Sequence, residues 1–68
     1  MTHYKLVLAS SVGQRDGMAL ELAEPNGERV AEVFEDDKTR QRTVKFYTLD
    51  PVPLDAIEWL LERAQTDL

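Results

Sequence analysis

The sequence predicts an α+β fold, in which a four-stranded antiparallel meander is followed by one C-terminal helix packed on one sheet face (ββββα). Two observations predict it. Four short segments with strand-like patterns are separated by turn-forming residues, and one segment with helical periodicity follows them. Because the connections are short, each strand is expected to pair with the next. We expect a single small domain over residues 1–68.

Alternating apolar residues identify the first two strands, at residues 4–9 and 18–24. Side chains two positions apart lie on the same face of a strand, so this period is typical of a half-buried sheet. Turn-forming residues, including Ser11, Gly13 and Gly17, separate the two segments. The face expected to point to the core carries Tyr4, Leu6, Leu8, Met18, Leu20 and Leu22.

The third and fourth strands, at residues 28–35 and 42–49, are rich in Val, Phe, Tyr and Thr, which favour a pleated sheet. Between the second and third strands, Pro25, Asn26 and Gly27 predict a tight hairpin. Pro25 suits the first turn position, and Gly27 suits the left-handed one.

Two registers are open for this hairpin. A three-residue loop sets Leu20 opposite Glu32, whereas a two-residue loop pairs Leu20 with Val33 and sets Glu21 opposite Glu32. Each register contains one unfavourable cross-strand pair, so the sequence alone does not choose between them.

A helix is expected from Pro53 to about Thr66. The fixed φ of Pro53 suits the first helical position, and Asp55 places an acid in the first turn, where the helix dipole favours it. At about 100° per residue, one apolar stripe consists of Leu54, Ile57, Leu60, Leu61, Ala64 and Leu68. The expected core of the domain is Leu6, Leu8, Leu20, Leu22, Ile57, Leu61 and Ala64.

Trp59 is expected to point away from this core, at about 165° from the centre of the stripe. Trp is enriched at the centres of protein interfaces, so a partner is one explanation for it. The other is that it covers Val52 or stacks on Arg63. A second candidate surface is the sheet face with small side chains, unless that face is simply solvated. The interface candidates are Trp59, Arg63, Val7, Ala9 and Ala19.

The composition argues against several functions. Asp and Glu number 13 and Lys and Arg number 8, and the resulting net charge of -5 opposes binding to nucleic acids and anionic membranes. No apolar run approaches the roughly 20 residues that span a bilayer, and no signal-peptide pattern is present, so we expect a cytoplasmic protein. The chain has no cysteine, and His3 is its single histidine, so we expect no disulfide, metal or cofactor.

The sequence also lacks an assembled catalytic motif. Ser10 and Ser11 have no recognisable base that would activate them. The segment from Gly13 to Gly17 lacks the Lys and the Ser or Thr that complete a phosphate-binding loop. We therefore expect that the protein is not an enzyme.

One segment suggests single-stranded nucleic-acid binding as an alternative. Aromatic side chains on a strand can stack on bases while neighbouring cations bind phosphates. Residues 38–47 supply both kinds of side chain, although the acidic residues 35–37 precede them and reduce the local positive charge. The structural explanation is a solvated turn that protects the sheet edge from aggregation. The nucleic-acid candidates are Lys38, Arg40, Arg42, Lys45 and Tyr47.

The meander with one C-terminal helix, together with the junction Thr48-Leu49-Asp50-Pro51 and Trp59, resembles the dimeric single-stranded-DNA-binding domains of the transcriptional-coactivator type. The resemblance is one of architecture, and it implies a dimer that binds DNA through a basic strand face. The acidic balance of this chain departs from that pattern, and a shared fold does not transfer function.

A non-catalytic protein-interaction module that forms a homodimer is the function that the sequence favours. A 68-residue domain without disulfide or metal has a small core, and oligomerisation is the remaining common source of stability. A different protein partner is a further possibility, and nucleic-acid binding remains the alternative.

Overall fold

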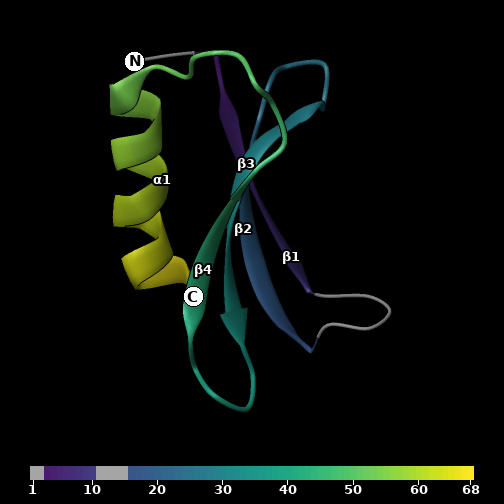
Figure 1. The fold of residues 1–68 in the computed structure, drawn as a ribbon, viewed down its shortest axis with the longest axis vertical. Coiled ribbons are helices and arrows are strands. Elements are labelled where there is room, and N and C mark those ends of the chain that lie inside the picture. Colours follow the sequence, from purple (N-terminus) through teal and green to yellow (C-terminus); the bar gives the residue numbers. More distant parts are fainter. Residues whose placement is uncertain (1–2, 11–15) are drawn as a thin grey trace.

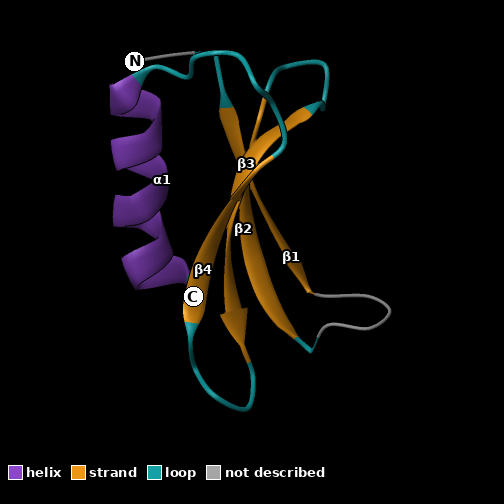
Figure 2. Ribbon diagram, in the orientation of Figure 1, coloured by secondary structure: helices purple, strands orange, loops and turns teal. Residues whose placement is uncertain are grey.

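The computed structural model describes residues 3–10 and 16–68. Its elements are β1 (Lys5–Ser10), β2 (Gly17–Ala23), β3 (Arg29–Asp36), β4 (Arg42–Phe46) and α1 (Leu54–Asp67). The strands form one antiparallel sheet in the order β1-β2-β3-β4, and α1 lies along one face of it (Figures 1 and 2). The predicted α+β meander is confirmed. The connection expected around Ser11 and Gly13 lies outside the described residues.

The strand register places the side chains in two sets, one on each face of the sheet. Paired residues share a face, so each row of the sheet can be read from β1 to β4. Two rows face α1: one is Leu6, Leu22, Ala31 and Phe46, and the other is Leu8, Leu20, Val33 and Val44. The far face carries the row Val7, Glu21, Glu32 and Lys45 and the row Ala9, Ala19, Phe34 and Thr43.

The loop between β2 and β3 has three residues. The N–H of Glu24 donates to the Glu28 carbonyl at 2.9 Å, and the N–H of Gly27 donates to the Glu24 carbonyl at 2.8 Å. Gly27 has a φ of 92°, the left-handed conformation that glycine adopts without steric cost. This is the three-residue turn predicted from Pro25 and Gly27.

A bulge beyond this loop then changes the register by one residue. Leu22 pairs with Ala31, which leaves Val30 as an extra residue of β3, and both Val30 and Ala31 are buried in the core. Leu20 consequently pairs with Val33, as the two-residue alternative predicted. The bulge keeps the apolar residues of both strands on the helix side, because a slip of one residue would move a whole set to the other face.

β4 is shorter than the predicted strand, since it ends at Phe46. The N–H of Tyr47 still donates to the Val30 carbonyl at 2.8 Å. Val30 is the second residue of β3, so β3 has little backbone left to pair with the residues after Tyr47. The hydroxyl of Thr48 accepts a hydrogen bond from the N–H of Asp50 at 3.0 Å. This local turn directs the chain toward α1.

The helix packs on β2 and β3 through Ala56, Leu60 and Ala64, which are buried. Two alanines on either side of one leucine allow the helix to approach the sheet closely. The predicted stripe was therefore centred about 60° away from the packed face. Pro53 is the N-cap, so the helix begins at Leu54, one residue later than predicted. The rotation brings Trp59 into partial burial against the core, so the expectation that it points away is wrong.

The predicted core is correct at its centre and wrong at two positions. Leu20, Leu22 and Ala64 are buried as expected, and Leu6 and Ile57 are half-buried against the same cluster. However, Leu8 is 51% exposed and Leu61 is 42% exposed. Leu8 lies on an edge strand beyond the helix, and Leu61 lies on a flank of the rotated helix.

Candidate interaction surface

A single helix does not cover the whole of this sheet. At a spacing of about 4.8 Å, the outer strands of four lie about 14 Å apart, whereas a helix with its side chains is about 10 Å wide. The helix packs on the two central strands, β2 and β3. Apolar side chains on the helix side of β1 and β4 are therefore left partly uncovered.

The uncovered area is largest at β4, which is exposed along its whole length. Val44 and Phe46 point to the helix side and are 48% and 53% exposed. Leu61 lies seven residues before Leu68 and therefore on the same helix flank. That flank ends beside β4, since the Leu68 carbonyl accepts a hydrogen bond from Arg42 at 3.4 Å. We call Val44, Phe46 and Leu61 the β4 surface.

The edge of β4 also has open backbone groups. Within the described part of the chain, β3 is the one strand paired with β4. Tyr47 donates to Val30 at 2.8 Å, and Asp36 donates to Gln41 at 3.0 Å, in one continuous register. Hydrogen-bonded pairs alternate along an antiparallel ladder, so residues 43 and 45 bond to β3. The backbone groups that point outward belong to Arg42, Val44 and Phe46.

Arg42 is engaged by groups of its own chain. Its guanidinium lies 3.6 Å from a carboxylate oxygen of Glu35 and donates to the carbonyl of Leu68. The last carbonyls of a helix lack intrahelical partners and carry the negative end of the helix dipole. Arg42 therefore ties the beginning of β4 to the end of α1.

The cations proposed for nucleic-acid binding do not share one face. Arg42 lies on the helix side of β4 and Lys45 on the far side, and each is opposite a glutamate of β3. Lys38 and Arg40 lie outside the strands, in the turn between β3 and β4. The cations of β4 and of the turn before it therefore point in several directions, and carboxylates partly offset their charge.

The far face of β3 and β4 holds a polar cluster that the sequence did not reveal. The Arg29 guanidinium lies 4.3 Å from the centre of the Tyr47 ring, 3.4 Å from a Glu21 carboxylate oxygen and 3.5 Å from the Tyr47 hydroxyl. The Lys45 ammonium lies 5.1 Å from the same ring, and Glu32 is only 1% exposed. The position of Arg29 in the sequence does not predict this cluster, because the bulge determines which side chains of the neighbouring strands lie together.

The turn between β3 and β4 is organised by Asp36. Its carboxylate accepts hydrogen bonds from the N–H groups of Lys38 at 2.8 Å and Thr39 at 3.0 Å, and its carbonyl accepts one from Arg40 at 2.9 Å. The backbone N–H of Thr39, followed by that of Lys38, holds the pKa of this carboxyl below its ordinary value. Arg40 has a φ of 63°, an uncommon conformation for a residue other than glycine.

The predicted interface residues are not gathered on one surface. Trp59 is half-buried against the core, and Ala19 is buried on the far face of the sheet. Val7 is exposed and Ala9 is half-buried, both on the far face of β1.

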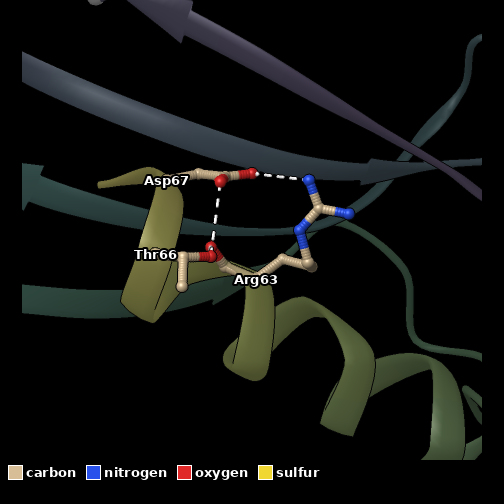
Figure 3. Close-up of polar contacts among 3 residues, drawn as sticks. All are labelled: Arg63, Thr66 and Asp67. Carbon is tan, nitrogen blue, oxygen red and sulfur yellow. Dashed lines mark hydrogen bonds and ion pairs between the residues drawn. The ribbon is translucent and has the colours of Figure 1, made fainter.

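Arg63, the fifth interface candidate, lies near the end of α1 in a local polar group (Figure 3). Its guanidinium donates to the Asp67 carboxylate at 3.1 Å. The hydroxyl of Thr66 donates to the Arg63 carbonyl at 3.1 Å and lies 3.3 Å from the other oxygen of Asp67. This pair partly offsets the unfavourable position of an acid at a helix C-terminus.

A small pocket of about 190 Å³ lies where the β2–β3 loop approaches the segment before α1. Its charged lining consists of Glu24, Glu28, Asp50 and Arg29. Small-molecule sites usually have about 300–1,000 Å³ and an apolar lining, so this pocket has few of their features.

No helix in the described residues is long and apolar enough to cross a membrane. The sequence matches no known protein-family model, and no curated protein or solved structure shows significant similarity to it. The function is therefore argued from the surface of the molecule.

Proposed function

We propose that this protein is a non-catalytic protein-interaction module that forms a homodimer through the β4 surface. The observation that supports the proposal is the exposure of Val44 and Phe46 on an open edge strand, together with that of Leu61 on the helix. An exposed apolar edge strand readily pairs with another strand, and proteins usually cover or charge such an edge. A partner that covers this surface would remove its apolar side chains from water.

The alternative is a domain that binds single-stranded nucleic acid through residues 38–47. The aromatic ring of Tyr47 beside Arg29 and Lys45 supports it, since stacked bases and phosphates are recognised by such groups. The separation of the cations between two sheet faces counts against it. This alternative predicts that the protein binds a labelled oligonucleotide and that the affinity falls steeply as the salt concentration rises.

The test of the proposed function is a pair of matched substitutions on the two edge strands. Phe46→Ser on β4 and Leu8→Ser on β1 each replace an apolar side chain that is about half exposed on the helix side. We expect Phe46→Ser to weaken self-association at least tenfold, as measured by sedimentation, and Leu8→Ser to leave it within about twofold of the unmodified protein. If both variants weaken self-association equally, or if neither variant weakens it, the assignment to β4 is contradicted.

A further inference from the structure

We infer that the second copy binds edge to edge, through antiparallel pairing of the two β4 strands about a two-fold axis at Val44. The inference rests on the proposed function and gives it a defined geometry. It joins the two four-stranded sheets into one continuous sheet, with both helices on the same face.

The open backbone groups determine which residues can pair. Arg42, Val44 and Phe46 direct their N–H and C=O groups outward, since the alternate residues bond to β3. The hydrogen-bonded pairs across the new interface must therefore form between residues of this set of three. Such pairing satisfies backbone groups as well as covering side chains, as in other cases of strand addition.

The side chains select one register among those that remain. A two-fold axis at Lys45 would set two ammonium groups opposite each other, which is unfavourable. An axis at Thr43 would leave Phe46 opposite Arg40, whose φ of 63° is incompatible with an extended strand. An axis at Val44 uses all three open residues of each copy. Val44 then faces Val44 of the second copy, and Phe46 faces its Arg42.

The distribution of charge also favours a second copy at this edge. The protein is acidic overall, with a net charge of -5, so most approaches of two copies bring like charges together. On β4, the cations Arg42 and Lys45 lie opposite the glutamates Glu35 and Glu32. Two copies can therefore meet at the β4 edge without bringing together an excess of charge of one sign.

The acids on the helix lie away from this edge. Asp55, Glu58 and Glu62 are exposed and, at about 100° per residue, lie on the side of α1 turned from the sheet. They therefore do not oppose one another in the proposed pairing.

Single-cysteine variants test this geometry, because the chain contains no cysteine and any disulfide must join two copies. Val44→Cys places two thiols opposite each other at about 5.5 Å between Cα atoms, within the range that a disulfide spans. We expect most of this variant to form a covalent dimer under mild oxidation. Val7→Cys, on the exposed face of the other edge strand, is the matched control and should remain mostly monomeric.

The outcomes separate the geometry from the proposed function. If the unmodified protein is dimeric but Val44→Cys does not crosslink, or Val7→Cys crosslinks equally well, the β4 pairing is wrong while self-association stands. If the unmodified protein is monomeric at all concentrations, both are wrong. Circular dichroism confirms that each variant is folded.

Amide hydrogen exchange provides an independent measurement on the unmodified protein. In the proposed dimer, the N–H groups of Val44 and Phe46 gain partners, so their exchange should slow at least tenfold as concentration rises. The amides of Thr43 and Lys45 already bond to β3 and should change less. Equal protection of all four amides with concentration, or no change at Val44 and Phe46, would overturn the pairing.

Discussion

At the scale of single residues, two adjacent leucines of α1 have opposite environments. Leu60 is fully buried between the helix and the sheet, whereas Leu61 is 42% exposed. Leu60→Ala should lower the free energy of unfolding by about 2 to 5 kcal/mol, because it leaves a cavity in the core. Leu61→Ala, which removes the same atoms, should cost under about 1 kcal/mol in dilute protein. Chemical denaturation of the two variants measures the difference, and equal losses would show that the helix is rotated from the orientation described.

Gly17 is a second residue whose environment leaves no space for change. A Cβ at this position would collide with the Glu35 carbonyl oxygen and lie 2.7 Å and 2.9 Å from two atoms of the Phe34 ring. Gly17→Ala should therefore destabilise the protein by about 1 to 3 kcal/mol, the usual range for overpacking. A thermal melt measures this. A variant as stable as the unmodified protein would mean that β2 and Phe34 are not in close contact.

At the scale of elements, the turn between β3 and β4 depends on the ionised form of Asp36. Its folded-state pKa is lowered, first by the Thr39 N–H and then by the Lys38 N–H. The turn's contribution to stability is therefore complete above the unfolded pKa of about 3.9 and is lost as the pH falls through the lower folded value.

The matched variant for this turn is Asp36→Asn, which keeps a side-chain oxygen as acceptor but has no titrating group. We expect the fall in stability between about pH 4 and pH 2 to be smaller in the variant than in the unmodified protein. Denaturation at several pH values measures it. Identical acid profiles would show that Asp36 is not involved.

The elements also show what the sequence can and cannot predict. Alternation and turn residues predicted all four strands, and Pro25 with Gly27 predicted the three-residue loop. The register beyond the loop was not predictable, because the bulge at Val30 has no local signature and depends on packing across two strands. The sequence does not predict the rotation of α1, because large apolar residues define the predicted stripe, whereas two small alanines set the packed face.

The uncovered β4 surface could have been expected, since a meander places its last strand at an edge and one helix covers about two strands. The polar cluster around Arg29 and Tyr47 could not, because its members meet only in the register that the bulge sets.

At the scale of the whole molecule, Trp59 and Phe46 should respond differently to substitution. Trp59 packs against the core of its own chain, so Trp59→Ala should lower stability by about 1 to 3 kcal/mol, less than for a fully buried Trp. That loss should be the same at low and high protein concentration. The effect of Phe46→Ala should instead grow with concentration, because the stability of a dimer is linked to the amount of protomer. Thermal melts over a hundredfold range of concentration distinguish the two, and a strong concentration dependence of the Trp59 effect would place Trp59 in the interface.

The most direct test of self-association is the mass of the unmodified protein in solution. Sedimentation equilibrium should show the mean mass rising from that of one 7.8 kDa chain toward twice that value as the concentration approaches about 0.5 mM. The mass should then level off, because a two-fold pairing of β4 edges closes on itself. A mass that stays at 7.8 kDa throughout would contradict the account, and one that continues to rise beyond the dimer would contradict the closed pairing.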